Sequence, residues 1–537
     1  MAKRYRPVAR DQAFLLPPDM REWLPPGHPV WLVITVVDEH LDTGAVHALR
    51  RAGGAGAAGY DPDMLVSLLV WAYANRVTSS RRIEALCRTD VAFKVICAGQ
   101  VPDHVTIARF RAGLGPAAGE LFRQVLALCA RLGMGQLGLV ALDGMKIAAS
   151  ASKSANRTEE ALRKLAQKMA AAHAATDAAE DDLFGPGVRG DEVPADLADP
   201  RTRADRIAAA LAELDAENRA AREDQERRDA RAQAYLAEPG TMGKPPAQAR
   251  VAAAHARVEA ATAVQQARIR DWQARTAASV AAGRGRLRGV TPAAPADCGK
   301  VARARAALER ARAAARADEA SAARSAPRQP AVRNVTDPHS RLMPVRGGGF
   351  IQGYNTQNVT SEDGLIIATQ LTADPVDTLW FEPMLRRAEE AAGLITATRP
   401  DGAGGDGPIG LMLADAGYLS VRNLTIPGPD RLIATGKRRN LDKQAAGQAR
   451  PAHADPAIAA MAARLATSDG ITAYRQRGHI AETPHGHIKH NVGFRQLSVR
   501  GKLRASAEWN LVCTVHNLLK AITTGHLTNA ALTNLPR

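Results

Sequence analysis

Two aspartates and one glutamate are the residues whose types and positions best fit chemistry. Asp143 ends the apolar run VALD, and Asp415 ends the apolar run MLAD. Side chains at the carboxyl ends of buried strands leave the core and meet ligands, so we expect these two carboxylates to lie side by side. A single strand-end aspartate is more often a cap for a turn, and the functional interpretation therefore depends on the pair.

A third acid, Glu482, lies two residues before Pro484. Proline is accepted only in the first turn of a helix, which predicts a helix that begins near Pro484 with Glu482 at its start. The positive end of the helix dipole favours an ionised carboxylate at that place. Three ionised carboxylates repel one another unless a hard cation lies among them, so these acids predict a Mg²⁺ site. Two ions about 3.5 to 4 Å apart would serve an in-line displacement at phosphorus, and we expect Mn²⁺ to substitute.

Other polar side chains near these acids are alternative candidates. Asp374 and Asp377 are alternatives to Asp415 as metal ligands, but Asp377 precedes Thr378 and is predicted to cap a helix. Four histidines surround Glu482 without the spacing of a zinc site, and they are predicted to be neutral hydrogen-bonding groups or phosphate contacts. They are His479, His485, His487 and His490. The glycine-rich loop 402–410 lacks the lysine and hydroxyl residue of a phosphate-binding loop, so nucleotide hydrolysis has no support.

The elements that must position the acids are strands and helices in alternation. Short apolar or alternating runs predict five strands, two of them joined by an Asp363-Gly364 turn. The strands are expected over residues 137–143, 350–360, 365–371, 409–415 and 431–435. Helices are expected over residues 378–392 and 508–523 and from Pro484 onward. The order describes an α/β core, a mixed five-stranded sheet flanked by helices.

The first 130 residues are predicted to form an all-α domain. Apolar residues recur at helical spacing from Tyr60 to Arg111, with helices over residues 80–88, 91–97 and 104–114, the last capped by Asp103. This arrangement resembles a helix-turn-helix, a bundle element that in other proteins also occurs without DNA. If it contacts DNA, three residues of its last helix would reach a groove. They are Thr106, Arg109 and Arg111.

Residues 156–333 differ in composition from the rest of the chain. They are rich in alanine, arginine, glutamate and glutamine, which predicts a helical insertion that separates residues 131–155 of the core from residues 334–537. Most of its charges are expected to face solvent. The part from Lys300 to Arg333 has nine basic and three acidic residues, so it is the part most suited to a phosphate backbone.

The overall composition favours a polyanionic partner. Among 537 residues, 71 are Lys or Arg and 55 are Asp or Glu, which gives a formal charge of +16. Neither a run of 18 apolar residues nor a leader peptide is found, and the five cysteines lie singly. We therefore expect a cytoplasmic, nucleoid-associated protein with reduced cysteines and without a membrane partner.

Several motifs together resemble the DDE transposases of bacterial insertion sequences. They are TDPHSRLM (336–343), QGYNTQ (352–357), ADAGY (414–418), the series Tyr474, Arg477, Glu482 and Lys489, and, in the N-terminal region, YDPDMLVSLLVWAYANR and PDHVTIARFR. The resemblance covers residues of about 10–155 and 333–525. It implies a ribonuclease-H-like catalytic core behind a helical transposase N-terminal domain.

The resemblance also implies roles for particular residues. Asp143, Asp415 and Glu482 would be the metal-binding catalytic triad, and Tyr474, Arg477 and Lys489 would position DNA phosphates. Four residues separate Arg477 from Glu482, where the signature has three, so Arg475 is an alternative to Arg477. Three further basic residues near the acids, Lys146, Lys437 and Arg438, would hold the DNA backbone.

The implied reaction is cleavage of double-stranded DNA at the terminal inverted repeats of an element, followed by strand transfer into target DNA. A homodimer is expected because two ends need two active sites. Two alternatives stay open: a DNA-binding protein without catalysis, derived from a transposable element, and a metal-dependent nuclease without strand transfer.

Overall fold

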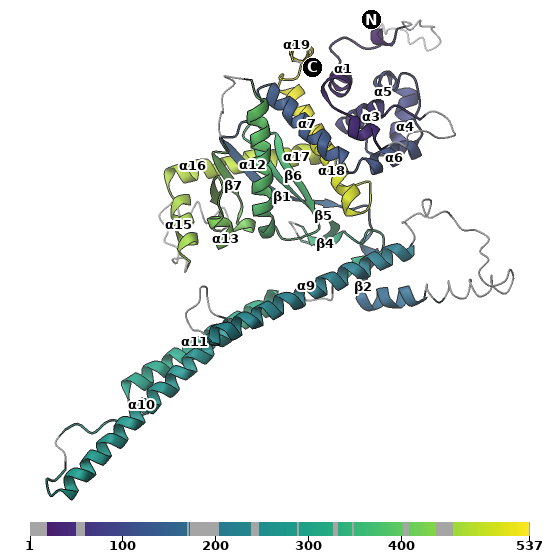
Figure 1. The fold of residues 1–537 in the computed structure, drawn as a ribbon. Helices are drawn as coiled ribbons and strands as arrows, with labels where there is room; N and C mark the ends of the chain where they lie inside the picture. Colours follow the sequence, from purple (N-terminus) through teal and green to yellow (C-terminus); the bar gives the residue numbers. More distant parts are fainter. Residues whose placement is uncertain are drawn as a thin grey trace, which may run out of the picture. The chain divides into compact units, whose positions relative to one another are not determined.

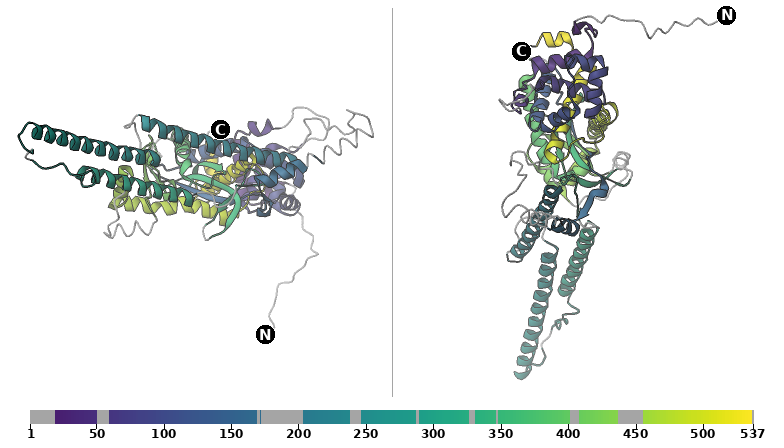
Figure 2. Two further views of the ribbon diagram at one scale, coloured as in Figure 1. Left: turned by 90° about the horizontal axis from the view of Figure 1, so that it is seen from below. Right: turned by 90° about the vertical axis from the view of Figure 1, so that its right-hand side faces the viewer.

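The computed structural model describes residues 19–49, 59–168, 171, 203–237, 246–286, 289–325, 331–345, 348–400, 408–436 and 455–535 (Figures 1 and 2). The chain divides into two compact units. The first comprises Met1–Arg157, Pro194–Ile207 and Arg333–Arg537, and the second comprises Thr158–Val193 and Ala208–Val332. The sheet lies among helices in the first unit, whereas the second unit consists mainly of long helices (Figure 1).

The N-terminal part of the first unit is helical, as predicted. Its elements are η1 (Met20–Glu22), α1 (Pro29–Thr35), η2 (Val36–His40), α2 (Gly44–His47), α3 (Pro62–Ala74), α4 (Ser80–Thr89), α5 (Val91–Ile96), α6 (His104–Gly113) and α7 (Ala117–Arg131). Asp103 caps α6 as expected, because its carboxylate accepts hydrogen bonds from the backbone N–H groups of Val105 at 2.9 Å and Thr106 at 3.0 Å. These helices share one hydrophobic core with the sheet.

The sheet is mixed, as predicted, but it has six strands in the described residues rather than five. They are β1 (Leu139–Ala148), β4 (Arg341–Pro344), β5 (Phe350–Ser361), β6 (Ile366–Thr372), β7 (Leu411–Ala414) and β8 (Asp430–Ile433). β4 and β6 both pair with β5, and the order continues through β1, β7 and β8. β5 is antiparallel to β1, β4 and β6, whereas β7 and β8 are parallel to β1. The additional strand, β4, has only four residues, too few for a clear alternating pattern.

Alternation along β1 and β7 divides their buried residues between two hydrophobic cores. Leu142 and Met412 belong to the large core, whereas Ala141 and Leu413 belong to a small core with Ile480. Helices and short helical segments surround the sheet. They are η4 (Thr378–Trp380), α12 (Phe381–Thr398), η5 (Ala416–Tyr418), α13 (Val421–Thr425), α15 (Pro456–Leu465), α16 (Ser468–Arg477), η6 (Gly478–Glu482), α17 (Thr483–Gly486), η7 (His487–Asn491), α18 (Lys502–Thr523) and α19 (Asn529–Thr533).

The prediction that a helix begins near Pro484 is wrong. Helical structure runs without a break from Ser468 to Asn491, with π-helical segments over Gly478–Glu482 and His487–Asn491. Pro484 follows the first π-helical segment, where the regular α-helical hydrogen-bond ladder is already interrupted, so the missing N–H of proline does not end the helix. Glu482 therefore lies inside a helical run, and the helix-dipole argument for its ionisation does not apply.

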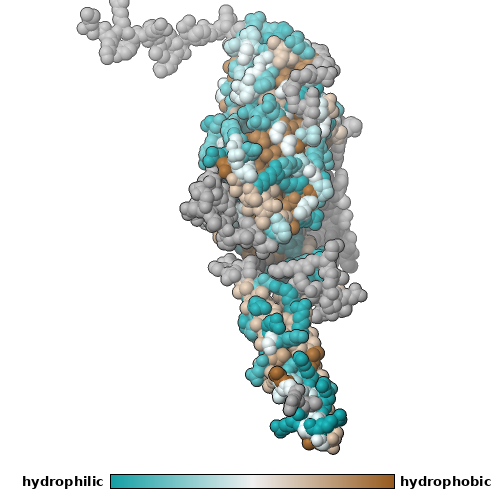
Figure 3. All heavy atoms as spheres, turned by 90° about the vertical axis from the view of Figure 1, so that its left-hand side faces the viewer, coloured by the Kyte–Doolittle hydropathy of each residue, from teal (hydrophilic) through white to brown (hydrophobic). Residues whose placement is uncertain are grey.

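The second unit contains most of α9 (Arg203–Ala237), α10 (Ala247–Ala281) and α11 (Gly299–Ser325). α10 and α11 pack together, with Ala254 and Val301 buried and Arg250 bonded to Asp318. The surface of the long helices that is visible in Figure 3 mixes hydrophilic residues with small hydrophobic patches. The short strands β2 (Asn156–Thr158) and β3 (Val332–Asn334) pair with each other. None of the helices in the described ranges combines the length and the apolar character that crossing a bilayer requires.

Candidate active site

The strands place Asp143 and Asp415 on one face of the sheet. Ala141 pairs with Leu413 in parallel register, and both side chains belong to the small core. Asp143 and Asp415 each lie two residues further along, so they point to the same face of neighbouring strands. The prediction that the strand ends at Asp143 is wrong. β1 continues to Ala148 because it pairs with β5 over nine residues. The parallel pairing with β7 stops at Leu142, so Asp143 lies at the point where its neighbour ends.

One arginine links the two aspartates. Arg477, the last residue of α16, places its Nη2 atom 2.8 Å from Asp143 Oδ1 and 3.7 Å from Asp415 Oδ2. The side chains of Arg477 and Asp143 are only 12% and 17% exposed, so this ion pair is largely removed from water. The sequence predicted Arg477 as a phosphate contact, and it did not show that the guanidinium would lie between the two acids.

The pKa values of the two aspartates shift in opposite directions. Burial alone would raise the pKa of Asp143, but the hydrogen bond from His485 and the positive charge of Arg477 outweigh it and hold that pKa below its usual range. Burial raises the pKa of Asp415, and the nearby carboxylates of Asp143 and Asp377 raise it further. The positive charge of Arg477 lowers it, but not enough to offset these effects.

This donor set fits a hard divalent cation. Carboxylate oxygens are the ligands that Mg²⁺ prefers. The charged guanidinium of Arg477 already lies between the carboxylates of Asp143 and Asp415. The ligand oxygens of Asp143, Asp415 and Glu482 are not all within 4.8 Å of one another. Glu482 is exposed at the end of η6, and its negative charge contributes to the raised pKa of Arg477.

Asp377 caps a helical segment, as predicted, but its side chain has other partners. Asp377 occupies the cap position of η4 without a side-chain cap bond. Its Oδ1 atom accepts hydrogen bonds instead from Asn355 Nδ2 and Gln357 Nε2 of β5, each at 2.7 Å. A Cβ atom on Gly417 would lie 2.9 Å from Asp415 Oδ1 and 3.4 Å from Asp377 Oδ2. Asp377 thus lies close to Asp415, which its separation along the sequence did not indicate.

Gly144 is expected to be intolerant of a side chain because it lies against the carboxylate of Asp377. A Cβ atom at Gly144 would lie 2.6 Å from Asp377 Oδ1 and 3.0 Å from Gln357 Nε2. Gly144→Ala should displace this bonded pair and lower the free energy of unfolding by about 1–3 kcal/mol, which denaturant titration would measure. Gly393→Ala in α12 is the control, because no atom lies within 4 Å of its Cβ position, and it should be neutral or stabilising. Equal stability of the two variants would contradict the expected crowding at Gly144.

The residues predicted to contact DNA fall into different environments. Tyr474 donates a hydrogen bond to the backbone oxygen of Ala414 at 3.3 Å, next to Asp415. Burial and the charge of Arg495 lower the pKa of Lys489, against the attraction of Asp143. Lys146 donates to the backbone oxygen of Pro344 at 2.9 Å. Lys437 and Arg438 lie outside the described residues.

The predicted groove contacts of α6 separate in the same way. Arg109 is exposed, and the Thr106 hydroxyl donates to Asp103 Oδ2 at 2.7 Å. Arg111 is 6% exposed and donates to the backbone oxygen of Thr78 at 2.5 Å and to Ser80 Oγ at 3.2 Å. Because Arg111 is enclosed by the helical region and α18, its place does not suit a contact with DNA.

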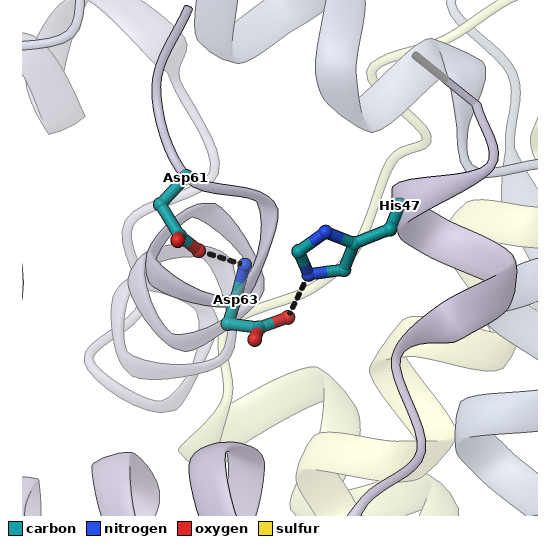
Figure 4. A group of neighbouring side chains, drawn as sticks. All are labelled: His47, Asp61 and Asp63. Carbon is teal, nitrogen blue, oxygen red and sulfur yellow. Dashed lines mark hydrogen bonds and ion pairs between the residues drawn. The ribbon is translucent and has the colours of Figure 1, made fainter. Parts of the chain in front are cut away.

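A second cluster of possible metal ligands lies in the N-terminal region. His47, Asp61 and Asp63 have ligand atoms within 4.8 Å of one another, the one such group of three in the described ranges (Figure 4). Asp61 caps α3 through the backbone N–H of Asp63 at 2.7 Å, and His47 Nε2 lies 2.9 Å from Asp63 Oδ1. Helix capping and a surface ion pair account for this group, so it does not indicate an ion site.

Two families of transposase domains match parts of the chain. A transposase domain (DUF772) matches residues 18–113, which include α3 to α6. A transposase DDE domain matches residues 438–522, which include Tyr474, Arg477, Glu482 and Lys489. The two matches support an insertion-sequence DDE transposase, and they confirm the resemblance in the sequence. Asp143 and Asp415 lie outside both matched ranges. No curated protein and no solved structure matches the chain.

Proposed function

We propose that the protein is a transposase that cuts and joins DNA with divalent cations held by Asp143, Asp415 and Glu482. The observation that carries this proposal is that Asp143 and Asp415 directly follow the last paired residues of β1 and β7, Leu142 and Ala414, with the guanidinium of Arg477 between their carboxylates. The mixed sheet, in which an antiparallel part is followed by two parallel strands, supports a ribonuclease-H-like core. The two transposase-domain matches support the same function.

The proposed organisation has four parts. Residues 1–130 form a DNA-binding helical domain, residues 131–155 and 334–537 form the catalytic core, and residues 156–333 are an insertion. The division of the described chain into two compact units supports the separation of the insertion from the rest. The partners would be the terminal inverted repeats, target DNA and a second copy of the chain, in a nucleoid-associated setting.

The residues of the site have distinct tasks in this proposal. Bound Mg²⁺ or Mn²⁺ would supply activation of the attacking oxygen and stabilisation of the leaving oxygen. Asp143 and Asp415 would hold positive charge where the pairing of β1 with β7 ends, and the negative charge of Glu482 acts on the same guanidinium of Arg477. Arg477 can bind a phosphate through two N–H groups once it no longer pairs with the acids. Lys489, inside the field of Asp143, provides a second cation for the DNA backbone.

The decisive experiment compares the wild type with Glu482→Gln on a labelled DNA duplex that contains the end of the element. The wild type should nick this duplex only with Mg²⁺ or Mn²⁺, and Glu482→Gln should lower the rate by roughly a hundredfold or more. Asp469→Asn is the matched control, because Asp469 is an exposed acid at the start of the same helical run.

The outcome also separates the proposed function from its alternatives. Nicking without joining to target DNA would indicate a nuclease, and DNA binding without nicking by the wild type would indicate a non-catalytic DNA-binding protein. A Glu482→Gln variant that cuts as fast as Asp469→Asn would refute the role of Glu482.

A further inference from the structure

A row of polar side chains crosses three strands of the sheet and begins at Asp143. Asp143 of β1 pairs directly with Asn358 of β5, and Asn358 pairs directly with Thr369 of β6. Residues that lie directly opposite one another in neighbouring strands point to the same face. Asn358 is 1% exposed and Thr369 is 6% exposed, so the row is buried beyond Asp143.

Two residues from the covering helices complete the row. Trp509 of α18 places Nε1 at 2.7 Å from Thr369 Oγ1, which lies 2.5 Å from Asn358 Oδ1. His485 of α17 places Nε2 at 2.9 Å from Asn358 Nδ2 and Nδ1 at 3.5 Å from Asp143 Oδ2. The result is a chain of hydrogen bonds from the indole of Trp509 to the imidazole of His485, whose Nδ1 atom faces the carboxylate of Asp143.

The chemistry of the groups fixes the direction of every bond in this chain. The indole N–H of Trp509 can only donate, so Thr369 Oγ1 accepts from it and donates its own hydrogen to Asn358 Oδ1. The amide of Asn358 then presents its NH₂ group to His485 Nε2, which must be the unprotonated acceptor nitrogen. The imidazole hydrogen therefore lies on Nδ1, directed at Asp143 Oδ2.

We propose that His485 is a positioning residue that holds Asp143 through its Nδ1–H, and that Trp509, Thr369 and Asn358 fix the tautomer of His485 that does so. The proposal rests on the proposed function, because it assigns His485 to the divalent-cation site. It explains why the two oxygens of Asp143 have different partners. Oδ2 faces His485 and Oδ1 faces Arg477, so Oδ1 is the oxygen presented to a cation.

The burial of the chain gives this arrangement its rigidity. A buried polar group without a partner is costly, and here each group in the chain has one. Thr369 Oγ1 also accepts from Cys513 Sγ at 3.7 Å, and its hydroxyl donates to Asn358 Oδ1. A ligand held in one tautomer and one orientation by partners outside the metal site raises metal affinity, and loss of such a partner typically costs about 10- to 100-fold.

The first test observes the tautomer directly in the full-length protein. In a sample labelled with ¹⁵N at histidine, the signals of His485 are assigned by their loss in His485→Asn. We expect a protonated Nδ1 and an unprotonated Nε2 in the wild type. Thr369→Val should let the Asn358 amide turn and change these signals, whereas Thr369→Ser should keep them. Thr514→Val is the matched control, because the buried Thr514 hydroxyl bonds only within α18.

The second test measures Mn²⁺ binding without DNA, by calorimetry and by the electron paramagnetic resonance signal of free Mn²⁺. His485→Gln extends its amide towards Asn358 and loses the donor to Asp143, so its dissociation constant for Mn²⁺ should rise by about tenfold or more. His485→Asn places an NH₂ group where Nδ1 was, and it should restore most of the affinity. Thr369→Val should weaken Mn²⁺ binding although it leaves His485 and Asp143 unchanged, and Thr514→Val should not.

The results separate this inference from the proposed function. If the wild type has its hydrogen on Nε2, or if His485→Gln and Thr369→Val bind Mn²⁺ as the wild type does, the role of His485 is refuted even though the protein cuts DNA. If the wild type shows the expected tautomer and the expected loss of Mn²⁺ affinity in the variants but cuts no DNA, the role of His485 stands and the proposed function fails.

Discussion

Asp143→Ala protein is expected to bind the DNA of element ends and to cut it at least about a thousandfold more slowly than the wild type. Asp143 presents Oδ1 to positive charge at 2.8 Å and is held at Oδ2 by His485 at 3.5 Å. The substitution removes the central carboxylate of the site and leaves Arg477 with only the more distant Asp415. Gel-shift titration measures DNA binding, and single-turnover nicking with Mg²⁺ measures cleavage.

Asp430→Asn serves as the control for Asp143→Ala. Asp430 begins β8, at the edge of the same sheet, and pairs on the surface with Arg464. A surface ion pair contributes little, so this variant should bind and cut DNA as the wild type does. Cleavage by Asp143→Ala at the rate of Asp430→Asn would show that the carboxylate is not part of the cutting centre.

Glu508→Leu is expected to destabilise the protein by about 3–5 kcal/mol. Glu508 of α18 has no exposed surface, and its carboxylate accepts from the Tyr73 hydroxyl at 2.5 Å and from the Ser498 backbone N–H at 2.8 Å. Arg111 Nε lies 3.9 Å from the same carboxylate. The substitution leaves the buried charge of Arg111 without its counter-charge. Denaturant unfolding followed by circular dichroism gives the loss.

A double-variant cycle tests the cause of this loss. Arg111→Leu with Glu508→Leu removes both charges, so the pair should be clearly more stable than the sum of the two single losses predicts. Glu508→Gln keeps an acceptor for Tyr73 and should lose less than Glu508→Leu. Additive losses in the cycle would mean that Arg111 and Glu508 do not interact across the buried region.

Strand β7 was predictable because burial on both faces leaves a continuous apolar run, and β5 was predictable because the Asp363-Gly364 turn signal follows it. The expected strand over residues 350–360 is β5, and the one over 409–415 is β7, within two residues at each end. The continuation of β1 beyond Asp143 was not predicted, because the alternation of Met145 and Ile147 with Gly144 and Lys146 is too short to define a strand on its own. It follows instead from pairing with β5, a partner more than 200 positions away along the chain.

The acids of the site were found from their place after apolar runs, but their partners were not. Arg111 was assigned to DNA because helical periodicity shows which residues share a face and not which element covers that face. α18 covers it, from the other end of the chain. Asn358 and Thr369 gave no signal, since a buried amide and a buried hydroxyl in a strand resemble any other polar position until register places them beside Asp143.

Consecutive residues of α18 serve two different regions of the first unit. Glu508 binds the hydroxyl of Tyr73 in α3, and Trp509 begins the hydrogen-bond chain that ends at Asp143. A chimera that joined these N-terminal helices to the sheet of a related enzyme would therefore have to carry α18 along with them. Replacement of the N-terminal helices alone would remove the Tyr73 partner of Glu508, next to the residue that bonds Thr369.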